Sequence, residues 1–224
     1  MARNRARAPL IGIVDSGGPA GQMPGARAFH ADGDGPARPD RLGHGSAVAA
    51  ILRRAAPDAQ LRHAQVFDER PVTSADRVAR ALDWLAAEDC DLILLSLGLA
   101  ADRPVLGAAC ARAVQRGRIL VGAAPARAAL PCWPAAYPGV IAATGDARCG
   151  WDDLSLLPGG VIGAWCASPE RGGSGMGGAS LAAARVAGHL AARFDEAQAD
   201  PLQWLVCQAS HRGPERRLPE AAAT

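Results

Sequence analysis

Short apolar runs recur along this chain and are separated by more polar segments. The runs span five to seven residues, a length that is typical of strands buried on both faces of a sheet. They predict strands at residues 10–14, 61–67, 91–97, 119–124, 140–144 and 161–165.

Amphipathic stretches fill most of the intervals between these runs. One begins at Ser74, a favourable N-cap residue, and places Val78, Leu82 and Leu85 on one face. Strands that alternate with helices indicate an α/β fold, in three αβα layers with a mostly parallel central sheet. The predicted helices cover residues 43–55, the stretch from residue 74, and residues 104–115, 181–194 and 202–209.

The composition is that of one globular unit. Of 224 residues, 49% are hydrophobic, which is enough to bury one sizeable core. The 26 glycines and 17 prolines are scattered, which favours many short turns over a low-complexity linker. We expect a mobile N-terminal arm at residues 1–9, a single domain at residues 10–210 and a flexible C-terminal tail at residues 211–224.

Charge and cysteine content argue against several function classes. The net charge is +2 and the 24 basic residues, all of them arginine, are dispersed, so we expect no nucleic-acid partner. No apolar run approaches the ~18–20 residues of a membrane span and no secretory signal is present, so we expect a cytoplasmic protein. The six cysteines form no CxxC pair, and we expect them to be reduced, with no metal and no cofactor.

Three segments carry residues that are suited to acyl transfer. Asp15 follows an apolar run in IGIVDSG, His44 opens a helix in GHGSAVAAIL, and Ser180 opens another in GGASLAAARVAG. A serine hydroxyl is a weak nucleophile at neutral pH and needs an imidazole to take its proton, while a carboxylate fixes the tautomer of that imidazole. We therefore expect Asp15, His44 and Ser180 to be the catalytic residues.

The order Asp, His, Ser along the chain is the order found in subtilisin. Over residues 10–194 the chain resembles the subtilisin-like serine peptidases of the S8 family, also in DLILLSLG, ILVGAAPA and WPAAYPGVIAATG. The resemblance implies a subtilisin-like fold, an acyl-enzyme mechanism and a peptide or protein substrate. It also implies that the substrate cleft is lined by Ser96, Leu97, Gly98, Ala123 and Ala124.

One feature that the resemblance implies is missing. The family has an asparagine whose side chain donates to the oxyanion, but Ala126 stands at that position and the one asparagine of this chain is Asn4. In subtilisin, loss of this donor lowers turnover by about a hundred- to a thousand-fold. We expect the backbone N–H of Ser180 to remain as an oxyanion donor, with Arg127 as a candidate replacement for the asparagine.

These departures favour a slow enzyme with a narrow specificity. Nine residues precede the first predicted strand, so we expect no inhibitory prodomain, and an unrestrained broad protease would be harmful in a cytoplasm. The energy of binding a single partner protein can instead be used to position one peptide bond of that partner for cleavage. The chain is similar in this respect to the compact bacterial subtilisin-like peptidases that remove a leader peptide from the gamma subunit of quinohemoprotein amine dehydrogenase. This resemblance implies one dedicated partner, which is processed during its maturation.

A pseudoprotease that binds a peptide without cleaving it is the alternative. The remaining motifs indicate no other chemistry. The glycines before Ser180 have the spacing of a dinucleotide fingerprint but follow no predicted strand. Asp32 and Asp34 lack the other ligands of a calcium loop, and His30 and His63 have no partner at ligand spacing. A Ser/Lys dyad is excluded because the chain has no lysine.

Overall fold

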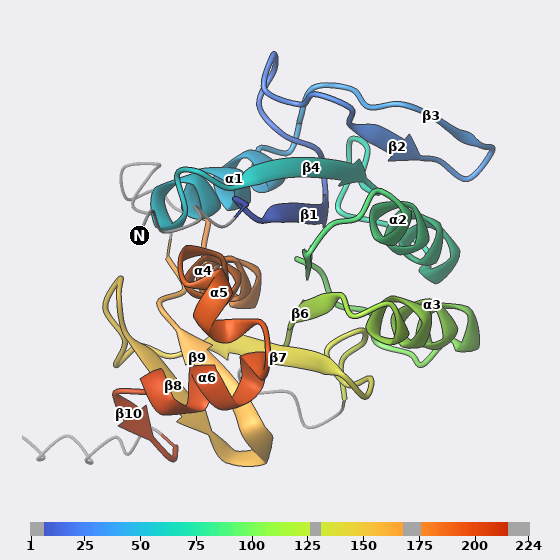
Figure 1. Cartoon of the computed structure of the whole chain (residues 1–224). Helices are drawn as coiled ribbons and strands as arrows, with labels where there is room; N and C mark the ends of the chain where they lie inside the picture. The colour runs from blue at the N-terminus through green and yellow to red at the C-terminus, as the bar shows by residue number, and fades with distance from the viewer. Residues whose placement is uncertain (1–6, 126–130, 168–175, 215–224) are drawn as a thin grey trace, which may run out of the picture.

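A single ten-stranded sheet runs through the protein (Figure 1). The computed structural model describes residues 7–125, 131–167 and 176–214. The strand order is β10-β8-β9-β7-β6-β5-β1-β4-β2-β3. The pairs β2–β3 and β8–β9 are antiparallel, and the other neighbours are parallel. The strands are β1 (Leu10–Asp15), β2 (Arg27–Phe29), β3 (Asp34–Pro36), β4 (Gln60–Gln65), β5 (Leu92–Leu95), β6 (Ile119–Ala123), β7 (Val140–Gly145), β8 (Leu154–Leu157), β9 (Val161–Ala164) and β10 (His211–Arg212).

Helices cover both faces of the sheet. Helices α1 and α4 pack with α5 and α6 on one face, and α2 and α3 pack on the other (Figure 1). Side chains of β1 alternate between the two cores, with Ile11 and Ile13 toward α1 and α4, and Leu10 and Val14 toward α2 and α3. The helices are α1 (His44–Ala55), α2 (Ala75–Ala87), α3 (Pro104–Gln115), α4 (Ala179–Ala192), α5 (Phe194–Ala197), α6 (Pro201–Gln208) and the 3-10 turn η1 (Pro158–Gly160).

The central parallel strands all end at one edge of the sheet. Strand β1 ends at Asp15, and β5 ends just before Ser96. Helix α1 begins at His44, and Ser180 lies in the first turn of α4. In open α/β sheets this carboxyl edge is where ligands bind. The fold thus brings the ends of four distant elements to the same edge.

The predicted α/β class and three-layer arrangement are confirmed, and the predicted central strands and helices are present within a few residues of their expected bounds. Strands β2, β3, β8 and β10 were not predicted. They are two to four residues long, too short to establish a periodic pattern. No helix in the described part of the chain is long and apolar enough to cross a membrane.

Residues next to both predicted domain boundaries contact the sheet where the structure describes them. Arg7 lies in the predicted mobile arm, yet its guanidinium donates to Asp91 at 2.7 Å. Strand β10 lies in the predicted flexible tail, yet it pairs with Ser155 and Leu156 of β8.

Candidate active site

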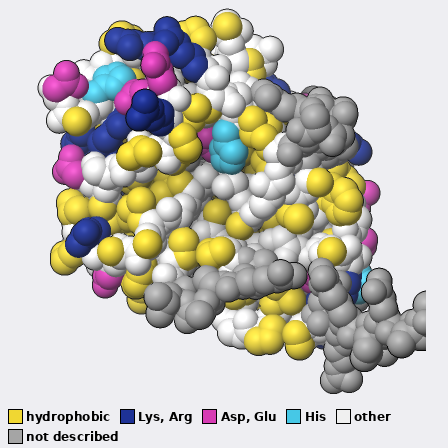
Figure 2. Space-filling model, turned by 180° about the vertical axis from the view of Figure 1, so that it is seen from behind, with side chains coloured by type: hydrophobic (Ala, Val, Ile, Leu, Met, Phe, Trp, Pro, Cys, Tyr) yellow, Lys and Arg dark blue, Asp and Glu magenta, His cyan; other side chains and the backbone are white. Residues whose placement is uncertain are grey.

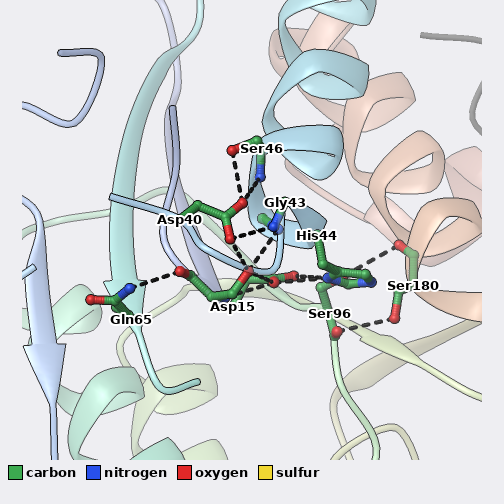
Figure 3. Close-up of polar contacts among 10 residues, drawn as sticks. Asp15, Asp40, Gly43, His44, Ser46, Gln65, Ser96 and Ser180 are labelled. Carbon is green, nitrogen blue, oxygen red and sulfur yellow. Dashed lines mark hydrogen bonds and ion pairs between the residues drawn. The ribbon is translucent and has the colours of Figure 1, made fainter. Parts of the chain in front are cut away.

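Asp15 and His44 form a hydrogen-bonded pair at the carboxyl edge of the sheet (Figure 3). The side chain of Asp15 is completely buried, and both of its carboxylate oxygens lie 2.8 Å from Nδ1 of His44. An ionised carboxylate only accepts hydrogen bonds, so the imidazole donates from Nδ1. The other ring nitrogen, Nε2, is thereby left as an acceptor in the neutral ring, which is the tautomer that a general base requires.

The pair is held where the turn that follows β1 lies against the first turn of α1. Ser16 donates its backbone N–H to Asp15 Oδ1 at 2.6 Å, and its hydroxyl oxygen accepts from the N–H of Gly45 at 2.9 Å. A Cβ at residue 45 would collide with the carbonyl oxygen of Gly17. Only glycine allows the first turn of α1 to lie this close to the end of β1.

Asp40 supports the start of helix α1. One carboxylate oxygen accepts from the N–H of Gly43 at 2.7 Å, and the other accepts from the N–H and the hydroxyl of Ser46 at 2.8 and 2.7 Å. The hydroxyl of Ser16 lies 2.9 Å from Asp40 and 3.1 Å from Asp15, so it can donate its one hydrogen to either carboxylate. Asp40 was not predicted as a site residue, although an acidic residue just before a helix start is a capping signal.

These carboxylates set the protonation of His44. Burial alone would lower the pKa of His44, but the hydrogen bond and negative charge of Asp15, with the charge of Asp40, raise it above its ordinary value. A raised pKa makes the imidazole a stronger base once it is deprotonated.

Ser180 lies across a cleft from this pair. It is the second residue of α4, whose N-cap Gly178 has a φ of 121°, in the left-handed region that favours glycine. His44 and Ser180 both line one cavity of about 610 Å³. The Ser180 hydroxyl donates to the carbonyl oxygen of Ser96 at 3.0 Å (Figure 3). Among the hydrogen bonds of the described residues, none joins the side chains of Ser180 and His44.

The cleft wall agrees in part with the expected residues. Ser96, Leu97 and Gly98 line the cavity, as the sequence resemblance implied. The described lining does not include Ala123 or Ala124: Ala123 is buried at the end of β6, and Ala124 lines a second cavity of about 450 Å³. The expected oxyanion position Ala126 and its candidate replacement Arg127 lie outside the described residues.

Most of the remaining wall is apolar and was not predicted. It comes from loops without periodic pattern, chiefly the segment after β4, so the sequence carried no signal for it. On the face shown in Figure 2, hydrophobic side chains border the hollow in which a histidine lies, and charged side chains gather to one side. The additional lining residues are Leu42, Phe67, Pro71, Val72, Thr73, Leu99 and Met176.

The other candidate sites take part in local contacts. Asp34 accepts from Arg80, and Nδ1 of His30 lies 3.0 Å from a carboxylate oxygen of Asp68. His63 is buried, and desolvation lowers its pKa to about 4. Within the described ranges, no three His, Cys, Asp or Glu side chains form a group that could hold a metal ion.

Comparison with known proteins identifies the type of fold. No protein-family model matches the chain. The minor extracellular protease Epr of Bacillus subtilis (strain 168) is 28% identical over 144 residues, which make up 59% of this chain and 22% of Epr. The matched segment is therefore a small part of that longer relative.

Three solved structures share the architecture. The S41 psychrophilic protease has 20% identity and a TM-score of 0.70, over 91% of this chain and 83% of that chain. The fold is subtilisin-like. The nisin leader peptidase NisP of Lactococcus lactis has 18% identity and a TM-score of 0.68, over 89% and 82% of the two chains. The epidermin leader peptide processing protease EpiP of Staphylococcus aureus has 16% identity and a TM-score of 0.68, over 87% and 68%.

Proposed function

We propose that this protein is a serine endopeptidase that removes a leader peptide from a partner protein. The observation that carries the proposal is the buried Asp15 bonded to His44 on one side of a cleft that Ser180 also lines. The subtilisin-like fold supports it, because that fold hosts the same three residue types in the same chain order.

The reaction follows from the geometry of the three side chains. The Ser180 hydroxyl leaves the carbonyl oxygen of Ser96 and donates to Nε2 of His44, which takes the proton as the oxygen attacks the peptide carbonyl. Asp15 stabilises the imidazolium that forms. His44 then returns the proton to the departing amine, leaving an acyl-enzyme. A water that loses a proton to His44 attacks the ester, and His44 gives this proton to the Ser180 oxygen as the acid product leaves. The backbone N–H of Ser180, in the first turn of α4, stabilises the oxyanion.

The cleft suits an apolar peptide. Among its described lining residues, His44 is the one ionisable side chain, and the wall is otherwise made of apolar side chains, hydroxyls and backbone. An extended segment with apolar side chains would bury them there without leaving a charge unpaired. As the dedicated partner we propose the gamma subunit of quinohemoprotein amine dehydrogenase, which the sequence resemblance suggests.

One observation favours a second candidate function. The Ser180 hydroxyl donates to Ser96 and not to His44, and such an arrangement would also suit a pseudoprotease that holds a peptide without cleaving it. The two candidates differ in whether Ser180 becomes acylated.

Labelling with a fluorophosphonate separates these two functions. The protein should be labelled at Ser180, and Ser180→Ala and His44→Ala should abolish labelling. Thr73→Ala, which removes another hydroxyl from the same cleft, is the matched control and should be labelled normally. Co-expression with the gamma subunit should then release a shorter gamma subunit only with the unsubstituted Ser180. An unlabelled parent that still binds the gamma subunit would establish the pseudoprotease instead.

A further inference from the structure

The guanidinium of Arg185 is buried within the protein, behind the turn that carries Ser180. Arg185 lies on α4 and is 2% exposed. Burying a guanidinium is costly unless hydrogen bonds replace its water. Nη1 donates to the carbonyl of Trp165 at 3.0 Å and approaches that of Leu181 at 3.4 Å, and Nη2 donates to the carbonyl of Ala167 at 2.7 Å.

The backbone held by Arg185 is the backbone that supports the start of α4. The N–H of Gly178 donates to the carbonyl of Cys166 at 2.8 Å. Ala167 and Gly177 form an antiparallel bridge. Arg185 therefore fixes the carbonyls on either side of Cys166, and the 166–167 segment in turn fixes the two glycines that lead into Ser180.

Trp151 orients the guanidinium. The centre of the Arg185 guanidinium lies 4.4 Å from the centre of the Trp151 ring, within the range of a cation–π contact. The exposed Arg54 also lies against this ring, at 3.6 Å. Two arginines thus share one aromatic partner, but it is Arg185 that donates to the backbone carbonyls of Trp165 and Ala167.

We propose that Arg185 is a positioning residue for catalysis: by clamping the 165–167 backbone, it holds Gly177 and Gly178 and so sets the place of the Ser180 hydroxyl and N–H relative to His44. The inference rests on the proposed function of Ser180. Arg185 itself does not touch the substrate. Planar guanidinium donors can reach two carbonyls at once, which the single ammonium of lysine does less well.

The test compares Arg185→Met with Arg54→Met. Both variants remove a guanidinium from the Trp151 ring, but only the first removes the clamp. In saturation kinetics with an alkyl fluorophosphonate, Arg185→Met should lower the maximal rate constant of Ser180 labelling by about tenfold or more. The half-saturating concentration should change by less than about threefold, because the cleft wall is unaltered. The rate constant of Arg185→Lys should lie between those of Arg185→Met and the parent, and Arg54→Met should have the parental rate constant.

Amide hydrogen exchange at Gly178 gives a readout that does not need catalysis. Exchange should be faster in Arg185→Met than in the parent and in Arg54→Met, because the acceptor at Cys166 is no longer held. A parental labelling rate in folded Arg185→Met would overturn the proposal. If Arg185→Met does not fold, Arg185→Lys decides: a lower rate at an unchanged melting temperature supports positioning, and a parental rate overturns it. If the parent itself is not labelled, the proposed function fails, and Gly178 exchange alone decides the positioning role.

Discussion

At the scale of residues, two histidines beside β1 have their pKa values shifted in opposite directions. His44 is 28% exposed and pairs with Asp15, which with Asp40 raises its pKa against the effect of burial. His63 lies on β4 opposite Ile13 and is 1% exposed, and desolvation lowers its pKa to about 4. At neutral pH His63 is therefore an uncharged packing residue, whereas the carboxylates of Asp15 and Asp40 favour the protonated form of His44.

His63 makes the stability of the protein depend on pH. Its folded pKa of about 4 lies below the ordinary value of 6.5, so the unfolded chain binds more protons between these pH values. Stability should fall as pH decreases from 6.5, by up to about 3 kcal/mol near pH 4. His63→Leu should remove this part of the pH dependence. Urea unfolding between pH 4 and 7.5 measures it, and parallel curves for parent and variant would contradict the prediction.

Which site residues sequence could predict depends on how local their signal is. Asp15 ends a strand, and His44 and Ser180 lie at helix starts. The order of predicted elements was therefore enough to place all three at one edge of the sheet, where the structure also has them. Ala123 and Ala124 were expected in the cleft from resemblance alone. Whether they line it depends on how the chain beyond β6 turns, which apolar periodicity does not encode.

At the scale of elements, the packing of α1 against α4 sets the distance between His44 and Ser180. His44 begins α1, and Ser180 lies in the first turn of α4. Near their far ends the helices touch at Gly188, where an added Cβ would lie 2.6 Å from the Cβ of Ala55. Glycine thus allows the close approach of the two helices that carry His44 and Ser180.

Gly188→Ala should push these helices apart. We expect a loss of stability of about 1–3 kcal/mol from overpacking and a roughly tenfold slower labelling of Ser180. Adding Ala55→Gly removes the colliding methyl group and should restore both quantities in large part. Gly35→Ala, at a site with no atom within 4 Å of an added Cβ, is the control. Thermal unfolding and fluorophosphonate labelling report the two effects, and failure of the double variant to recover would exclude this collision as the cause.

Asp40 couples the cap of α1 to the pKa of His44. Its charge is one of the causes that raise that pKa, so Asp40→Asn should lower it. In the proposed mechanism neutral His44 is the base, so labelling should rise with pH through this pKa, and the midpoint in the variant should lie at lower pH than in the parent. The rate of Ser180 labelling between pH 5 and 9 measures the midpoint. Asp58→Asn, an exposed change at the opposite end of α1, should leave it in place.

Periodicity predicted the elements that are long and buried and missed those that are short and exposed. All four residues of β5 are buried, whereas β3 (Asp34–Pro36) has no buried residue and contains glycine and proline, which are rare in strands. Strand β3 exists because it pairs with β2, and β2 pairs with β4. Such pairing is decided by tertiary contacts, so it lies beyond what a single segment of sequence specifies.

At the scale of the whole molecule, charged and apolar surfaces are separated. Ion pairs gather over β2, β3 and α2, where Arg80 contacts both Asp34 and Asp76 and Arg77 contacts Asp68. The cleft at the carboxyl edge is bordered mainly by apolar side chains (Figure 2). We therefore expect the cleft to select a substrate by apolar contact, with its specificity determined by the loops that line the cleft.

Val72 tests this selection, because it lines the cleft and is 69% exposed in the free protein. Burying a side chain of this size against an apolar ligand contributes about 1.5 kcal/mol, or roughly tenfold in affinity. Val72→Glu should thus slow labelling of Ser180 by a leucine-containing peptidyl phosphonate about tenfold, and the lysine-containing analogue should be affected less because a carboxylate attracts it. Val105→Glu, on α3 and 45% exposed, introduces the same charge away from the cleft and should leave both rates unchanged. Equal effects of the two substitutions, or an unchanged preference between the probes in Val72→Glu, would show that the cleft around Val72 does not receive the substrate side chains.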